Sequence, residues 1–174
     1  MRYVIVSNVN GDAGTFNNNI RREVFNRFKA RSSKLPAHFT IKAPFQSDNI
    51  QEIESALCNF CKNHHGVYYD IKNYDHFGNR VIYMKVLMSD EGRVLHNELI
   101  EAISFCKDIE FQKSEGKDKV FHITVTSKKI QDKFDEIWRY VNDYPCEFHC
   151  KFDNVTIYKW EDMTWKLHKE YKMI

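Results

Sequence analysis

Two short segments of the chain share a pairing of residue types that is suited to chemistry. The stretch PAHFTIKAPF at residues 36–45 and the stretch KVFHITVTSK at residues 119–128 each centre on a histidine, one apolar residue and a threonine. An imidazole has an ordinary pKa of about 6.5, so of two imidazoles one takes a proton while the other gives one. Threonine hydroxyls donate hydrogen bonds to phosphate oxygens. The doubled His-x-Thr segment therefore indicates acid/base chemistry on a phosphodiester, and this chemistry needs no metal.

Both segments have the pattern of β-strands, in which successive side chains point to opposite faces. The apolar residues of each segment share one face and need a core to cover them. The other face carries the polar groups, which alternation assigns to His38, Thr40 and Lys42 in the first strand and to His122, Thr124, Thr126 and Lys128 in the second. We expect these faces to line a wet cleft, where the two lysines stabilise negative charge in the transition state.

One aromatic residue follows the first segment. Phe45 lies at the exit of the first strand, where it is either a platform for stacking a nucleobase or a member of the core. The sequence leaves both interpretations open. Tyr158, Trp160 and Trp165 pose the same alternative, between stacking on bases and packing across the strands of a hairpin.

The elements that must position these residues follow from apolar periodicity. Helices are expected where apolar residues recur every three to four positions, and strands where they alternate. Asp48 or Asn49 is expected to cap the second helix. The predicted order is a strand at 2–8, a helix around 20–28, the strand holding His38, a helix at 50–60, a hairpin with arms 67–77 and 79–88, a helix at 91–106, the strand holding His122, a helix around 134–141, and a second hairpin with arms 147–160 and 164–173.

The element order repeats at a fixed distance. The two histidines are 84 residues apart, and the same offset carries the first hairpin onto the second without a gap, matching Tyr68 to Phe152 and Tyr83 to Leu167. The repeat units span about 36–88 and 120–172. We therefore expect an α+β, bilobal fold with two pseudo-symmetric lobes of antiparallel sheet, each lobe with a strand, a helix and a hairpin, and with helices on the outer faces. An approximate two-fold axis would place the two motif strands side by side at a central cleft.

Length and composition favour one domain over residues 1–174 and restrict the partners. The chain has 43% hydrophobic residues and a formal net charge of only +2, so nucleic-acid binding would depend on a local patch and not on the field of the whole molecule. No apolar run is long enough for a signal peptide or a membrane span. Five cysteines without a secretory signal favour free thiols. We expect a cytoplasmic monomer that binds no membrane.

The two motifs resemble those of the 2H phosphoesterase superfamily, which includes the 2′-5′ RNA ligase-like and cyclic phosphodiesterase proteins. PAHFTIKAPF is similar to the first motif of that family, including the Pro before the histidine and the Phe after it, and FHITVTSK is similar to the second. The order of strands and helices extends the resemblance over the whole chain.

The resemblance implies a bilobal α+β fold and a reaction without cofactors. The implied reaction is hydrolysis of a 2′,3′-cyclic phosphate or a 2′-5′ linkage, or the reverse ligation, with RNA ends, oligonucleotides or cyclic nucleotides as partners. His38 and His122 become the acid/base pair, and Thr40 and Thr124 the donors to the phosphate. The resemblance favours His122 as the group that activates the nucleophile and His38 as the group that protonates the leaving oxygen, but the sequence alone leaves this order open.

Three alternatives remain open at this stage. The same cleft would serve a non-catalytic module that binds RNA or a nucleotide. The stretch CNFCKNHH at 58–65 has the residue types of a zinc site, but no second Cys pair accompanies it, and Cys58 and Cys61 are more simply small core residues at the end of a helix. The charged stretch QKSEGKDK at 112–119 is either a solvated loop or a lid over a phosphate next to His122.

Overall fold

The structure is a computed structural model that describes all residues from Met1 to Ile174. It is an α+β fold of two antiparallel sheets and four main helices, as the sequence predicts. The elements in chain order are β1 (Arg2–Asn8), α1 (Gly11–Phe28), β2 (His38–Gln46), α2 (Ile50–Asn63), β3 (Val67–Phe77), β4 (Val81–Met88), α3 (Asp90–Ser104), β5 (His122–Thr126), α4 (Phe134–Asn142), β6 (Glu147–Phe152), β7 (Asn154–Glu161) and β8 (Thr164–Lys172).

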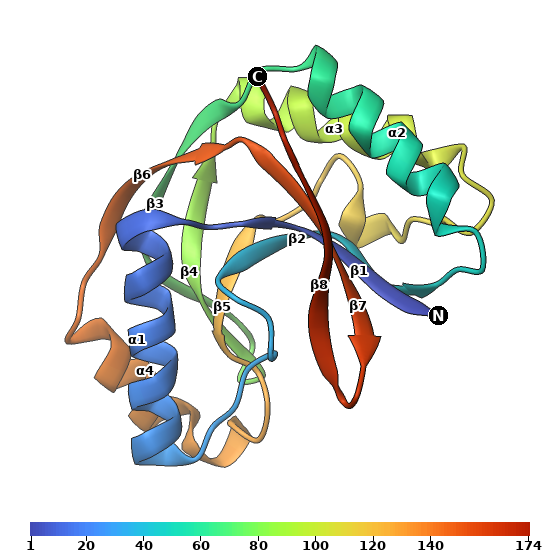
Figure 1. Cartoon of the computed structure of the whole chain (residues 1–174). Coiled ribbons are helices and arrows are strands. Elements are labelled where there is room, and N and C mark those ends of the chain that lie inside the picture. The colour runs from blue at the N-terminus through green and yellow to red at the C-terminus, as the bar shows by residue number, and fades with distance from the viewer.

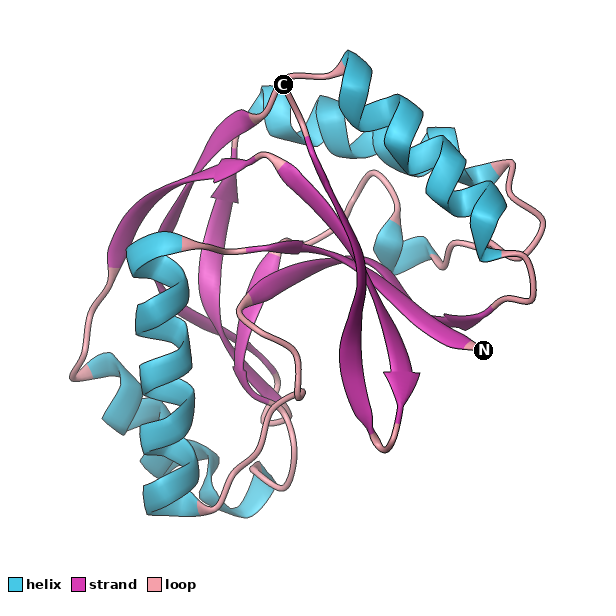
Figure 2. Cartoon of the chain, in the orientation of Figure 1, coloured by secondary structure: helices cyan, strands magenta, loops and turns pink.

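The two sheets meet at the strands that carry the motifs. One sheet has the order β2-β1-β7-β8 and the other has the order β5-β4-β3-β6. The strands β2 and β5 are therefore edge strands, and they contact each other across the junction of the sheets. The helices lie in two groups, α1 with α4 and α2 with α3, at opposite sides of the sheets (Figures 1 and 2). This arrangement confirms the predicted bilobal fold.

The path of the chain between the sheets differs from the prediction. The arm expected at 147–160 is two strands, β6 and β7, which divide at Asp153 and enter different sheets. Each motif strand also lies in the opposite sheet from the hairpin that follows it, so neither sheet is built from one continuous repeat unit. The lobes are therefore interleaved, and the contiguous lobes that the repeat suggested are wrong. The alternation within one strand does not show which other strand it pairs with. The sequence pattern therefore could not predict that each motif strand lies in the opposite sheet from the hairpin that follows it.

The residues next to the motif histidines anchor both strands in one core. Phe39 is 1% exposed and its ring packs edge-to-face on the rings of Phe121, Tyr69 and Phe152, with centroids 5.5, 5.8 and 5.0 Å away. Phe121 directly precedes His122. Because aromatic side chains bury a large area and hold defined geometry, this cluster fixes the two motif strands relative to each other.

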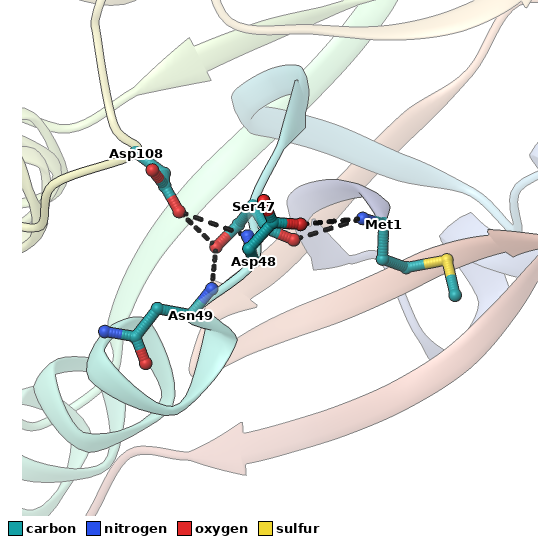
Figure 3. A network of polar contacts seen from close by, with 5 residues as sticks. All are labelled: Met1, Ser47, Asp48, Asn49 and Asp108. Carbon is teal, nitrogen blue, oxygen red and sulfur yellow. Dashed lines mark hydrogen bonds and ion pairs between the residues drawn. The ribbon is translucent and has the colours of Figure 1, made fainter.

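A polar network fixes the far end of β2 (Figure 3). The hydroxyl of Ser47 donates to Asp108 Oδ2 at 2.7 Å and accepts from the backbone N–H of Asn49 at 3.0 Å. The N-cap of α2 is Asn49, but its side chain makes no capping bond. The predicted position of the cap is thus confirmed at Asn49, but its side chain does not cap the helix, and Ser47 accepts from the Asn49 backbone N–H instead.

Two further sequence expectations concern membranes and thiols. None of the helices has the length and apolar character required to cross a membrane. All five cysteines are free thiols, as predicted.

Candidate functional site

The two motif histidines are held in the same way. His38 Nδ1 lies 2.6 Å from the carbonyl oxygen of Pro36, and His122 Nδ1 lies 2.9 Å from the carbonyl oxygen of Val120. A carbonyl only accepts, so in each ring Nδ1 carries the hydrogen and donates it. This bond fixes the tautomer and leaves Nε2 of both neutral rings as the atom that exchanges protons with a ligand.

Both histidines are neutral at pH 7 in the free protein. Burial lowers the pKa of His38 to about 4; its bond to Pro36 opposes this shift, and the charges of Arg21 and His122 add to it. Burial also lowers the pKa of His122, with a further contribution from the Lys119 charge. The two rings are carried by β2 and β5, which contact each other. An anion between them would raise both pKa values, because it favours the charged imidazole.

A cavity brings the two motifs together. Thr40 from β2 and His122 from β5 line the same cavity of about 430 Å³, whose wall also includes Phe77, Asp118 and Lys119. His38 lies two residues before Thr40 on the same strand, and Thr40 and Thr124 are both half-buried. The cavity therefore has the imidazole of one motif and the hydroxyl of the other on its surface, whereas His38 and Thr124 are not part of its lining.

Two predicted site residues are buried and are not part of the lining of this cavity. Lys42 is 4% exposed and Thr126 is fully buried. The cause is a register shift in each motif strand directly after its threonine. In the first strand, Thr40 pairs with Val6 of β1 and Lys42 pairs with Ile5. In the second, Thr124 pairs with Tyr83 of β4 and Thr126 pairs with Ile82. Each motif strand has two residues where its neighbour has one, as in a β-bulge.

The bulges turn these two side chains to structural partners. Lys42 Nζ forms an ion pair with Glu115 at 3.0 Å, and the hydroxyl of Thr126 donates to the carbonyl of Arg31 at 3.0 Å. Strict alternation had assigned both residues to the cleft, and their partners now account for them. The contacts follow the offset of the predicted repeat, since residues 42 and 126, like residues 31 and 115, are 84 apart.

The ion pair of Lys42 also decides the nature of the 112–119 loop. The Glu115 carboxylate accepts from the backbone N–H groups of Ala43 at 2.6 Å and Gln112 at 2.9 Å in addition to Lys42. Burial alone would raise the pKa of Glu115, but these donors outweigh it and the pKa is lowered. The loop is thus anchored to β2 through a buried carboxylate, while most of its other side chains are exposed, as the solvated interpretation predicts.

The remaining predicted residues lie at the periphery. Lys128 is exposed, just beyond the end of β5. Phe45 is half-buried against the main core, with its ring 6.1 Å from that of Tyr3. Trp160 and Trp165 are paired across the β7–β8 hairpin with centroids 5.1 Å apart. These three aromatic residues pack within the fold, which was the simpler of their two interpretations.

Two aromatic residues beside His122 were missed by the sequence reasoning. The ring of Phe77 is 5.0 Å from the His122 ring in an edge-to-face arrangement, and the ring of Tyr83 is 5.2 Å from it. Tyr83 is buried and pairs with Thr124 in the sheet, whereas half-buried Phe77 lines the cavity. Their positions in a predicted hairpin gave no signal, because the adjacency of β4 and β5 is a tertiary feature.

The segment 58–65 shows no gathered metal ligands. Cys61 is buried in the core, where burial raises the pKa of its thiol to about 12. The ring of His64 stacks on Phe60 at 3.9 Å and its Nδ1 lies 2.8 Å from the Phe60 carbonyl. No group of three or more His, Cys, Asp or Glu side chains in the structure has a geometry that would hold a metal ion.

Comparison with known proteins agrees with this geometry. The family model of the 2′-5′ RNA ligase superfamily matches residues 18–164. Among solved structures, Escherichia coli LigT complexed with 3′-AMP is similar at 13% identity with a TM-score of 0.63, covering 99% of this chain and 97% of that one. The Thermus thermophilus protein TT0787 is similar at 12% identity with a TM-score of 0.58, covering 99% and 98%. At these identities the structures establish the fold. A search of curated protein sequences finds no match.

Proposed function

We propose, from the premise that this chain belongs to the 2′-5′ RNA ligase superfamily, that it is a phosphodiesterase acting on 2′,3′-cyclic phosphate or 2′-5′ bonds of RNA or nucleotides. The observation that carries the proposal is the matched pair of histidines, each with Nδ1 committed to a backbone carbonyl and Nε2 left for proton transfer. A module that only binds phosphate would have no need of two neutral imidazoles with the same tautomer.

The proposed reaction is a displacement at phosphorus. One neutral imidazole takes a proton from water through Nε2 while the water oxygen forms a bond to phosphorus. The other, protonated when the anionic substrate enters, gives its proton to the leaving ribose oxygen as the old P–O bond breaks. The hydroxyls of Thr40 and Thr124 donate to the non-bridging oxygens and stabilise the charge that accumulates on them. Ligation uses the same groups with a ribose 5′-hydroxyl in place of water: that hydroxyl loses its proton to one imidazole and attacks a 2′,3′-cyclic phosphate, while the other imidazole protonates the 3′ oxygen as its bond to phosphorus breaks.

The order of the two histidines follows the resemblance in this proposal. His122 activates water and His38 protonates the leaving oxygen. The low pKa of His38 requires that the substrate phosphate raises it before it serves as an acid. Phe77, on the cavity wall, is placed to contact a nucleobase or ribose of the bound substrate.

Single substitutions at the histidines test the proposal. Turnover of 2′,3′-cyclic mononucleotides and of 2′-5′ oligoadenylates is measured for the wild type, His38→Ala, His122→Ala and the double variant. Each single change should lower the rate by about 10²–10⁴-fold with a much smaller effect on affinity for the substrate. The double variant should lose far less than the product of the single losses, because the pair acts as one unit.

The matched control is His149→Ala, which removes an exposed imidazole on β6 that lies next to Asp70 and outside the motifs. It should turn over substrate at the wild-type rate. A wild type that binds these compounds but hydrolyses none of them, with affinity that weakens as pH rises, would instead identify a binding module.

A further inference from the structure

A second pocket lies beside the first motif and is lined by cations. It has a volume of about 650 Å³ and is formed by α1 and by the loop that leads into β2. No acidic side chain lines it. Its cations, together called the basic pocket here, are Arg21, Arg22, Arg31, Lys34 and Lys128. In a chain with a net charge of only +2, this is a strong local concentration of positive charge.

Most of this charge is not neutralised within the protein. Arg21 is fixed by backbone carbonyls and a serine, with Nη1 donating to Leu35 O at 2.9 Å and Nε donating to Ser32 Oγ at 2.8 Å. Arg31 and Lys128 form no ion pair, and their backbones are bridged across the junction of the two sheets. Only Arg22 has an acidic neighbour, Glu23, at 4.0 Å. An anion in the pocket would therefore meet positive charges of which only that of Arg22 has an acidic partner.

The basic pocket adjoins the catalytic pair. Pro36 is part of its lining, and the carbonyl of Pro36 holds the His38 ring. The Arg21 charge is close enough to contribute to the lowered pKa of His38. The pocket thus lies beside the backbone segment that holds the His38 ring.

The two pockets are related by the same offset as the two motifs. The loop before β2 contributes Arg31, Lys34 and Pro36 to the basic pocket. The residues 84 positions further along, in the loop before β5, are Glu115, Asp118 and Val120, and they line the cavity that also contains Phe77 and His122. One pocket therefore lies beside each histidine, and the two differ in character: the cavity beside His122 has an aromatic wall and the pocket beside His38 has a cationic one.

We infer that the basic pocket binds the phosphate backbone of a single-stranded oligonucleotide whose reacting phosphate lies between His38 and His122. The inference rests on the proposed function for the position of that phosphate. A mononucleotide with one phosphate would leave the five cations without a ligand, whereas an oligonucleotide would place a nucleoside against Phe77 and its neighbouring phosphates in the basic pocket. The preferred substrate class is then the oligonucleotide and not the cyclic mononucleotide.

Binding measured without turnover tests this inference independently of catalysis. The probe is a fluorescent single-stranded DNA hexanucleotide, which has no 2′-hydroxyl, and its anisotropy is followed from 50 to 300 mM salt. The variant Arg31→Gln/Lys128→Gln should bind about 10–30-fold more weakly at 0.1 M salt, and its slope of log affinity against log salt should be shallower by about 1.4, since each phosphate contact to a single strand contributes about 0.7. The control Lys62→Gln/Lys107→Gln removes the same charge from α2 and from the segment after α3.

A second measurement connects the pocket to the reaction. The ratio of kcat/KM for a short RNA ending in a 2′,3′-cyclic phosphate to kcat/KM for the cyclic mononucleotide should fall about tenfold in the pocket variant and stay constant in the control. Equal salt slopes for the pocket variant and the control would overturn the inference. Pocket-dependent binding to anionic phospholipid vesicles without binding of the hexanucleotide would overturn it as well. If hexanucleotide binding depends on the pocket but no substrate is turned over, the basic pocket still binds a single strand and the proposed function fails.

Discussion

The buried ion pair beside the cavity gives the sharpest expectation for stability. The side chains of Lys42 and Glu115 are each 6% exposed, and the carboxylate also accepts from two backbone N–H groups. The variant Glu115→Gln keeps the shape of the side chain but leaves the Lys42 ammonium buried without a counter-charge. Breaking one partner of a buried pair costs about 3–5 kcal/mol. For a domain of this size, the melting temperature should fall by roughly 6–20 °C.

Urea unfolding at pH 7 and thermal unfolding measure this cost. The control is Glu110→Gln, which removes an exposed carboxylate a few residues earlier in the chain. The double variant Lys42→Met/Glu115→Gln should recover part of the loss, because the unpaired charge is gone. The pH dependence has a definite sign. Glu115 has a lowered pKa in the folded protein, so its stabilisation is present above the ordinary value of 4.5 and is lost as the pH falls through the folded value.

The difference in free energy of unfolding between the wild type and Glu115→Gln should therefore become smaller below about pH 4.5. A variant whose unfolding free energy stays within about 1 kcal/mol of the Glu110→Gln control at pH 7 would refute the reasoning. In that case the carboxylate would be solvated or already protonated, and the loop would be held by other contacts.

Further expectations concern single residues. An NMR titration should show the His38 imidazole losing its proton with a midpoint near pH 4, and added phosphate should raise that midpoint. Because the unfolded chain takes up this proton at a higher pH than the folded protein, the free energy of unfolding should fall as the pH is lowered from about 6.5 to 4. A titration midpoint near 6.5 in the folded protein would contradict the burial argument. In the native protein at pH 8, Cys61 should resist a thiol reagent that labels half-buried Cys58, because burial raises the Cys61 pKa to about 12; equal labelling rates would count against this. The change Phe39→Ala should cost about 3–5 kcal/mol in urea unfolding, and a loss below about 1 kcal/mol would show that the aromatic cluster does not join the motif strands.

The sequence was sufficient for the features that depend on local periodicity. Alternation and helical spacing predicted β2, β5, the hairpin of β3 and β4, and the four main helices, because each of these elements buries a face that its own residues define. The start of α1 was predicted near residue 20 and was wrong, since the helix begins at Gly11. The pairing of residue types singled out the histidines and threonines as the candidate site, since proton transfer and phosphate binding need these groups wherever the fold places them.

Only the tertiary structure decided which neighbours each strand has, and the misplaced residues follow from that. Lys42 and Thr126 leave the cleft because a bulge follows Thr40 and Thr124, and a bulge is a mismatch between two strands that neither strand shows alone. The partners of these side chains, Glu115 and the Arg31 carbonyl, are 73 and 95 residues away along the chain. The alternation of side chains is a property of one segment. The register between strands, the assignment of strands to sheets and the charge beside His38 all depend on contacts between segments that are far apart in the chain. The pattern within one segment therefore cannot predict them.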